Sequence, residues 1–389
     1  MSEIKVNSIK GVGASTAAIT VNNTNGTCTA NITNNLSNRN LIINGAMQVA
    51  QRGTSSTDSG YGSVDRFRVQ HGGTDEAPTQ AQVDVASGTT PYTLGFRKAF
   101  RITNGNQTSG AGATDSIHFE YYAEAQDIAN SGWNYLSSSS FITLSFWIKS
   151  SVAQNFQGRV RTRQGTSYNY AFETGSLSAD TWTKITKTIP GNSNLQFDND
   201  TAKNFQIDIY AFYGTDYTSS AVSLDTWAAY ASGTQVKDVT STWYTTNDAT
   251  LEITGVQLEV GSVATDFEHR SFGQELYLCQ RYFELVKWKY YYATGYYEGG
   301  GAPRIPLSWN VEKRATPTVT LPTVGTGSGQ IQVTSSGGAY DTGNNNIQAN
   351  HISTLFTRIV GSGYGGSAGT PCSLYINGTD GSVQISAEL

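Results

Sequence analysis

The chain has 389 residues, enough for two or three domains, and is 38% hydrophobic but only 14% charged, with a net charge of −5. Average globular chains are about a quarter charged, and here 41 glycines, 22 tyrosines and many serines, threonines and asparagines take that share. This composition predicts an all-β protein, and the negative charge argues against a nucleic-acid-binding surface.

The cysteines and the apolar runs exclude further classes. Cys28, Cys279 and Cys372 lie far apart, so neither a disulfide framework nor a zinc site is expected. No run of 18 apolar residues predicts a membrane span, and the opening "MSEIKVNSIK" lacks the apolar region of a signal peptide. We therefore expect folding in a cytoplasm, although the composition is typical of an outward-facing β protein. A virus particle released by lysis reconciles the two.

Residues 1–39 form a predicted leader. Residues 11–38 contain no charged side chain, and short β-branched runs such as "AAITV" alternate with Asn and Gly turn signals. One interpretation is a disordered tail. The other is a segment that becomes ordered with copies of itself or on another protein.

Residues 40–270 alternate apolar and polar side chains with a period of two, as β-strands do. In "FQIDIYAFY" the apolar face includes Ile207 and Ile209, so Asp208 is expected on the opposite, solvated face. In "LEITGVQLEV" the alternation changes parity at Gly255, which predicts a β-bulge. Many such strands without long helices predict a jelly-roll β-sandwich.

The period then changes to that of a helix, predicted over 271–288. Ser271 and Gln274 form a capping-box signature at its start. The apolar stripe packs either on its own chain or at an oligomer axis, because a helix of this length is marginal alone. The stripe comprises Phe272, Leu276, Cys279, Phe283 and Val286.

Residues 289–389 are predicted to form a second β domain, which the helix joins to the first. The tyrosines between 290 and 297 flank Thr294-Gly295, a pattern that favours an aromatic hairpin used for packing. Short strands and Gly-rich loops follow. No repeat of fixed period is visible, which argues against a parallel β-helix.

Several of these stretches resemble tail-fibre and related virion appendage proteins of marine and cyanobacterial tailed phages. They are "MSEIKVNSI", "NRNLIINGAMQVAQRG" with "YGSVDRFRV", "GVQLEVGSVATDFEHRSFGQELYLCQRYF" and "RATPTVTL". The stretches "LSFWIKS", "TWTKITKTI" and "ITGVQLEVG" also resemble jelly-roll carbohydrate-binding modules.

The resemblance implies a role for the pair Asn44-Gly45. It would form a turn or bulge where the chain enters the sandwich, with Asp65 and Arg66 nearby and the last strand close by. Some of these modules hold a structural calcium ion between the first and last strands, but the sequence does not assign its oxygen ligands here. No other cofactor is expected.

No catalytic motif is present. The histidines are scattered, and HExxH and P-loop patterns are missing from the sequence. A glycosidase needs two carboxylates across one sugar, and no local motif marks such a pair. We therefore predict a protein that is not an enzyme, with a polysaccharide depolymerase as the alternative.

Two groups of residues are candidates for glycan binding. Arg159, Arg161 and Arg163 of "RVRTR" share one strand face, which is either an anionic-glycan site or, as we favour, an exposed charged face balanced by neighbouring acids. Aromatic rings provide stacking surfaces for sugars, although packing explains them as well. The aromatic candidates are Trp133, Tyr135, Tyr340 and Tyr364.

The resulting hypothesis is a structural appendage of a tailed phage virion, on the tail or the capsid surface. It would assemble in the host cytoplasm as a homotrimer, dock on other virion proteins through residues 1–39, and contact host-surface polysaccharide. The alternatives are a capsid-decorating fibre and a structural tail adaptor without glycan binding. Neither nucleic acid nor membrane insertion is expected.

Overall fold

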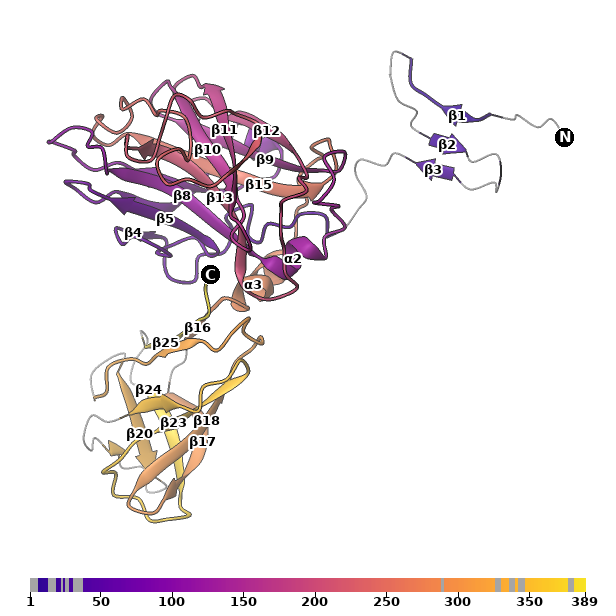
Figure 1. The fold of residues 1–389 in the computed structure, drawn as a ribbon. Helices are drawn as coiled ribbons and strands as arrows, with labels where there is room; N and C mark the ends of the chain where they lie inside the picture. The colour runs from indigo at the N-terminus through magenta and orange to yellow at the C-terminus, as the bar shows by residue number, and fades with distance from the viewer. Residues whose placement is uncertain are drawn as a thin grey trace.

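The computed structural model describes residues 6–12, 19–21, 24, 28–30, 38–287, 290–325, 330–335, 340–341, 347–376 and 381–389. Nearly all regular structure is β, which confirms the predicted fold class. Figure 1 shows a large sandwich, a smaller β domain beside it, and a small N-terminal sheet apart from both. Across the described ranges, no helix has the length and apolarity needed to cross a membrane.

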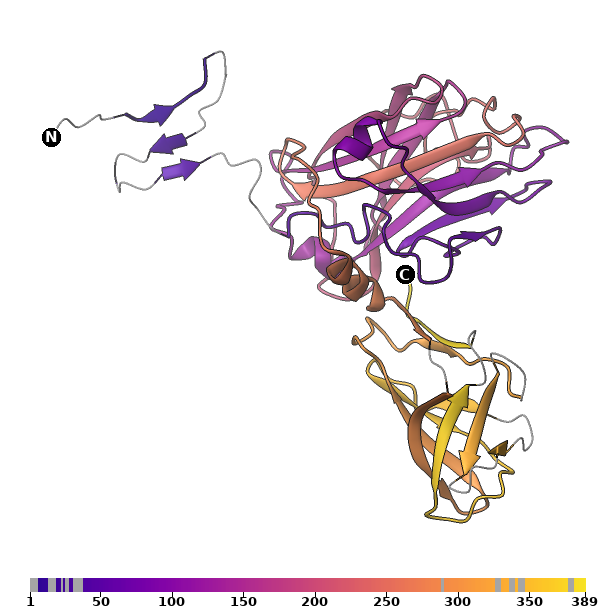
Figure 2. The ribbon, with the colours of Figure 1, turned by 180° about the vertical axis from the view of Figure 1, so that it is seen from behind.

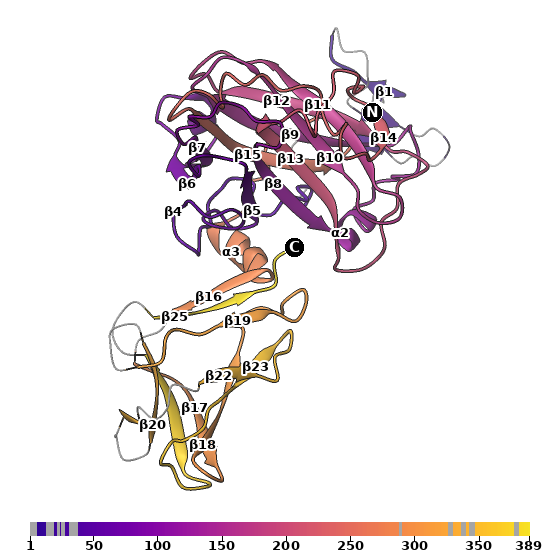
Figure 3. The same cartoon turned by 60° about the vertical axis from the view of Figure 1, so that its left-hand side comes forward.

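Two six-stranded antiparallel sheets form the sandwich (Figure 3). Consecutive strands pass repeatedly from one sheet to the other, as in a jelly roll. Sheet 1 has the order β14-β11-β10-β13-β8-β5 and sheet 2 the order β12-β9-β15-β7-β6-β4. The strands are β4 (Ser55–Ser56), β5 (Phe67–Gly72), β6 (Thr79–Asp84), β7 (Lys98–Thr103), β8 (Ser116–Glu124), β9 (Phe141–Ser150), β10 (Asn155–Arg161), β11 (Tyr168–Ser176), β12 (Thr183–Pro190), β13 (Lys203–Tyr213), β14 (Trp227–Ala229) and β15 (Thr250–Val260).

The core lies between the two sheets and follows the alternation of the sequence. Ile207 and Ile209 of β13 are buried there with Leu144 and Phe146 of β9. The predicted bulge is confirmed at Gly255, where the register of β15 against β9 shifts and φ is +62°. A β-carbon at this position would lie 2.6 Å from the Phe96 ring, so both the backbone angle and the packing require glycine.

The entrance of the chain into the sandwich is a turn at Asn44-Gly45, as predicted. Asn44 has a φ of +62°, and its side-chain amide donates to the Asp65 carbonyl at 2.9 Å. Gly45 allows the backbone of the turn to approach β15 closely, because a β-carbon there would lie 2.1 Å from the Val256 carbonyl oxygen of β15. The entrance turn therefore lies against the last strand of the sandwich, β15, and against Asp65, just before β5.

The predicted helix over 271–288 is too long, so its apolar stripe does not lie on one helix. Helix α3 spans Phe272–Gln280, and residues 283–287 form strand β16 instead. Cys279 is buried and Leu276 half-buried, but Phe272 is 55% exposed. Two short helices that the sequence did not predict, α1 (Thr90–Thr93) and α2 (Ala125–Ala129), complete the helical structure of the described residues.

Glu275 explains how α3 is actually held. Its carboxylate accepts a hydrogen bond from the Asn44 backbone at 2.8 Å and lies 3.5 Å from Arg270. The capping box of Ser271 and Gln274 is confirmed. The helix therefore docks on the entrance turn through a buried polar residue that is not part of the predicted apolar stripe.

The C-terminal β domain packs a three-stranded sheet, β16-β25-β19, against a seven-stranded sheet, β21-β20-β24-β17-β18-β23-β22. The predicted hairpin at Thr294-Gly295 is wrong, because β17 continues through it and the chain turns after Glu298. The strands are β16 (Phe283–Lys287), β17 (Tyr290–Glu298), β18 (Ala302–Ser308), β19 (Thr318–Thr320), β20 (Ile331–Ser335), β21 (Tyr340–Asp341), β22 (Gln348–Asn350), β23 (Phe356–Val360), β24 (Pro371–Ile376) and β25 (Ser382–Ser386).

The C-terminal residues return to the sandwich (Figures 1 and 2). Glu388 forms ion pairs with buried Arg66 at 2.5 Å and with Arg52 at 3.2 Å. Arg281, just after α3, pairs with Glu124 of β8 at 2.9 Å. The two β domains are thus joined by the helix and by charged contacts across the junction.

The described parts of the leader form a separate three-stranded antiparallel sheet (Figure 2). Its strands are β1 (Ser8–Ile9), β2 (Ile19–Val21) and β3 (Cys28–Ala30). Val6, Ile9 and Val12 are exposed. The role of residues 1–39 in attachment stays a prediction.

Candidate functional site

The outer face of sheet 1 carries a cluster of charged, histidine and tyrosine side chains. Strand alternation turns residues 118, 120 and 122 of β8 and 206, 208 and 210 of β13 to this face. The register places Arg159 opposite Asp208, Asp208 opposite Glu120, and Glu120 opposite Arg68. One row across four strands therefore has two carboxylates flanked by two guanidiniums.

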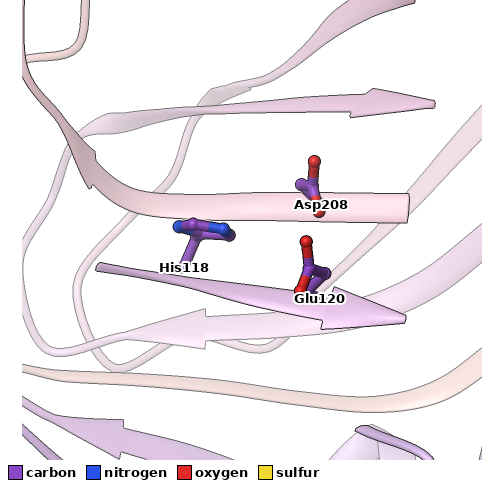
Figure 4. A group of neighbouring side chains, drawn as sticks. All are labelled: His118, Glu120 and Asp208. Carbon is purple, nitrogen blue, oxygen red and sulfur yellow. The ribbon is translucent and has the colours of Figure 1, made fainter. Parts of the chain in front are cut away.

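Each carboxylate of this row is paired with an arginine of the same row. Arg159 Nε donates to Asp208 Oδ2 at 2.5 Å, and Arg68 Nε lies 3.0 Å from Glu120 Oε2. Figure 4 shows Glu120 and Asp208 side by side on neighbouring strands, with His118 next to them. All three are buried. Charges removed from water need such partners, because an unpaired buried charge is strongly destabilising.

Burial and the neighbouring charges shift these groups in different directions. Burial lowers the pKa of His118 to about 4, so the ring is neutral at pH 7. Burial and the adjacent Asp208 raise the pKa of Glu120. Burial would raise the pKa of Asp208 as well, but Arg159, His118 and hydrogen bonds outweigh it, and the pKa is lowered. Asp208 therefore holds its negative charge more strongly than Glu120.

His118, Glu120 and Asp208 are the only group of the described residues whose side-chain ligand atoms could surround a metal ion, lying within 4.8 Å of one another. The group does not fit one. Two guanidiniums already neutralise both carboxylates, and further positive charge would be repelled. Calcium also needs six to eight oxygen ligands, which these three residues do not supply. We assign no metal to this face.

The connection between β13 and β15 covers this end of the face. Gln235 from that connection accepts a hydrogen bond from Arg159 and another from the Tyr213 hydroxyl at 3.1 Å. The rings of Tyr210, Tyr213 and Tyr217 stack at centroid distances of 4.3 and 4.5 Å. The paired row therefore has no open space for a substrate, and we call it the closed end.

The predictions for Asp208 and for "RVRTR" are corrected here. Asp208 points away from the core, as the alternation required, but it is fully buried, because the connection covers the face. Arg159 is likewise buried and paired. Arg161 and Arg163 are half-buried, and no described carboxylate lies within salt-bridge distance of either. The arginines are thus neither fully exposed nor uniformly balanced.

The other end of the face, near the end of β8, is open and positively charged. The Arg161 guanidinium lies 3.4 Å from the ring centroid of Tyr230, and its Nε donates to Ser167 at 2.9 Å. Arg163 donates to Gln206 at 2.8 Å. Exposed Lys203 completes the set, and within the described ranges it too has no carboxylate partner. We call Arg161, Arg163 and Lys203 the cation cluster.

The members of the cation cluster are close enough to shift one another's pKa values. Burial and the neighbouring Arg163 lower the pKa of Arg161, and the same two causes lower the pKa of Lys203. Arg163 and Lys203 both lie over the Tyr122 ring, at 5.3 and 4.9 Å from its centroid. Like charges held this close favour an anion between them. The open end thus gathers three cations in a chain of net charge −5.

The predicted aromatic sites lie elsewhere. Trp133 is buried in the sandwich core and donates to the Ser140 carbonyl at 3.3 Å, so it packs and does not face a ligand. Tyr364 is buried in the core of the C-terminal domain. Tyr135 is half-buried against Phe197. The backbone of Tyr340 lies in β21, but its side chain falls outside the described residues.

Sequence reasoning missed Tyr122, His118, Glu120 and Lys203. A signal was present, because "SIHFEYY" alternates like the other strands and places the first three on one face. What the alternation did not show is which strands are neighbours, and therefore that "RVRTR" lies beside them.

No family model matches the sequence, and no curated protein matches it. Three similar solved structures are the enzymatically active domain of tailspike protein 4 of bacteriophage CBA120, a putative sugar binding protein from Bacteroides thetaiotaomicron, and the N-terminal cellulose-binding domain of Cellulomonas fimi β-1,4-glucanase C. Their identities are 12%, 12% and 11%, with TM-scores of 0.32, 0.30 and 0.26. They cover 57%, 57% and 56% of this chain.

The match covers 21% of the tailspike chain, 100% of the Bacteroides protein and 99% of the cellulose-binding domain. The matched part of this chain thus spans about a fifth of the length of the tailspike chain. At these TM-scores the likeness carries no inference about function.

Proposed function

We propose that this protein is a non-enzymatic, glycan-binding structural appendage of a tailed phage, and that the cation cluster binds acidic polysaccharide. The observation that supports the binding role is the set Arg161, Arg163 and Lys203, which lies at the open end of a sandwich face without a described carboxylate partner. A carboxylate or sulfate of a sugar would supply the missing charge. Charge-assisted hydrogen bonds to such groups are the strong ones.

The binding role is favoured over catalysis by the closed end. His118, Glu120 and Asp208 would be the acid–base groups of this face, but ion pairs and the connection from β13 to β15 occupy the space around them. General acid–base catalysis requires such a group within hydrogen-bond reach of the substrate. The open end, by contrast, has cations and tyrosines and lacks a described carboxylate in salt-bridge reach of its cations.

The virion role rests on the sequence motifs that resemble phage fibres. In this proposal residues 1–39 dock on other virion proteins, three chains associate, and both β domains point toward the host surface. Sedimentation of the intact protein at micromolar concentration gives the number of chains. A monomer would argue against the trimer.

The binding role is tested with full-length protein and a panel of polygalacturonate, alginate, chondroitin sulfate and polysialic acid, with dextran as the neutral control. The double variant Arg161→Ala/Arg163→Ala is expected to bind roughly tenfold or more weakly, since each arginine contributes a charge-assisted hydrogen bond. The matched control is Lys98→Ala/Arg304→Ala, which removes the same charge from two paired residues elsewhere.

Binding of the parent should weaken with added salt, because the open end is accessible to ions. Equal loss in both double variants would mean unspecific charge attraction and would contradict the site. Release of new reducing ends from any polymer of the panel would instead favour the depolymerase alternative.

A further inference from the structure

The outer face of sheet 2, on the opposite side of the sandwich, contains a hollow of about 360 Å³. Its floor is formed by Ser145 and Trp147 of β9, Lys184 of β12 and the bulge at Gly255. Two segments wall it: the residues after α1, including Phe96, and residues 265–269. Pockets that bind small ligands start at about 300 Å³.

The walls of the hollow are held firmly. The rings of Phe96 and Phe267 lie edge to face at 4.9 Å, and His269 packs on both at 5.1 and 4.9 Å. His269 Nε2 lies 2.9 Å from the Leu94 carbonyl oxygen, which ties the two walls together. The bulge at Gly255 leaves room for Phe96. The hollow is therefore a built feature of the fold and not a gap between mobile loops.

Polar groups without partners converge on this hollow. Lys184 lies directly opposite Trp147 in the register of β12 and β9. Within the described part of the chain, Lys184, the Asp266 carboxylate, the Trp147 indole N–H and the Ser145 hydroxyl form no side-chain hydrogen bond or ion pair. Trp147 is half-buried, and Lys184 and Asp266 are exposed.

We infer that this hollow binds one neutral hexopyranose residue of a glycan. A half-buried indole is a flat apolar surface for the C–H face of a sugar ring. A carboxylate, an ammonium group, a hydroxyl and an indole N–H supply acceptors and donors for its hydroxyls. Because Lys184 and Asp266 oppose each other in charge, the hollow suits an uncharged sugar, unlike the cation cluster on sheet 1.

The test uses full-length protein and methyl glycosides of glucose, galactose, mannose, N-acetylglucosamine, fucose and rhamnose, observed by saturation-transfer NMR and titration. At least one glycoside is expected to bind with a dissociation constant on the order of 1 mM, the affinity of a small ligand held by few contacts. Trp147→Ala and Asp266→Asn should each weaken it roughly tenfold, because the first removes the stacking surface and the second a charged acceptor.

Three controls keep the outcome decisive. Trp182→Ala removes a second half-buried tryptophan, just before β12, which lies under Lys149 and does not line the hollow, and should leave binding unchanged. Asp266→Asn changes an exposed residue, so it tests the site even if Trp147→Ala fails to fold. Arg161→Ala/Arg163→Ala should bind the glycoside normally, which separates this inference from the proposed acidic-glycan site.

Saturable binding of none of the six glycosides would overturn the inference. So would binding that Trp147→Ala and Asp266→Asn leave unchanged, or that Trp182→Ala weakens equally. Binding of free indole in the hollow without any glycoside would assign it to an aromatic ligand and would overturn it as well.

Discussion

Both ends of the outer face of sheet 1 contain arginines, but the arginine at one end is paired with a carboxylate and those at the other end are not. At the closed end, Arg159 and Asp208 are buried, paired and covered. At the open end, Arg161 and Arg163 are half-buried without a described carboxylate partner. Arg161 and Arg163 follow Arg159 in the sequence by two and four residues. Burial with pairing makes a charge part of the structure, whereas partial exposure without pairing makes it available to a ligand.

The largest expected effect is at the closed end. Arg159→Ala leaves the Asp208 carboxylate buried and unpaired, and should lower the free energy of unfolding by about 3–5 kcal/mol. Urea denaturation followed by circular dichroism measures it. The double variant Arg159→Met/Asp208→Leu should recover much of this loss, because removing both charges also removes their desolvation cost. A loss below about 1 kcal/mol for Arg159→Ala would be typical of an exposed pair and would contradict the closed end.

The same contrast of buried and exposed applies to the stripe at the domain junction. Phe283 is 1% exposed and lies 3.5 Å under the Arg52 guanidinium, so Phe283→Ala should cost about 2–5 kcal/mol. Phe272, at 55% exposure, is the matched control and should change stability by less than about 0.5 kcal/mol. Thermal unfolding of both variants measures the difference. Equal losses would show that the stripe is one seam after all.

That stripe also shows which features can be predicted from the sequence and which cannot. The helix start at Ser271 followed from local chemistry, because a capping box needs only residues three apart. The helix end did not, because the apolar spacing of Phe283 and Val286 also suits the strand β16, which pairs with β25 almost a hundred residues later. Local patterns therefore predict elements, but not the long-range pairing that decides between them.

The candidate site shows the same limit of prediction from local sequence patterns. Alternation predicted correctly that Asp208 points away from the core. Its burial depends on Gln235 and on the tyrosine stack, whose last ring, Tyr217, comes like Gln235 from the connection between β13 and β15. The bulge at Gly255 was predicted from the change of parity, yet the hollow above it also needs residues from four other segments of the chain.

A smaller effect concerns pH at the closed end. Burial holds the pKa of His118 at about 4 against 6.5 in the unfolded chain. Between these values the unfolded chain binds the proton more readily, so the contribution of His118 to stability is present above pH 6.5 and is lost as pH falls. The loss amounts to about 3 kcal/mol by pH 4.

His118→Gln isolates this contribution. Burial raises the pKa of Asp65 and of Asp127 to about 6, which favours the folded state at lower pH and opposes the effect of His118. The difference between parent and His118→Gln removes these shared terms. That difference, measured by urea denaturation at pH 7 and pH 4.5, should shift in favour of the variant at the lower pH. A difference independent of pH would mean that His118 is hydrated in solution.

The smallest effect on stability is expected at the open end, where Arg163→Ala should change the free energy of unfolding by no more than about 0.5 kcal/mol. The variant loses hydrogen bonds from Arg163 to Gln206 and to the Tyr122 hydroxyl, but it also relieves the repulsion that lowers the pKa of Arg161 and Lys203. These contributions have opposite sign and nearly cancel.

The salt dependence of the stability of Arg163→Ala is the more sensitive measurement. Removing one of three close cations should raise the relative stability of the variant at low ionic strength, where repulsion is least screened, and the gain should disappear near 1 M salt. A loss of several kcal/mol at every salt concentration would show that Arg163 is as structural as Arg159, and the two ends of the face would then be alike.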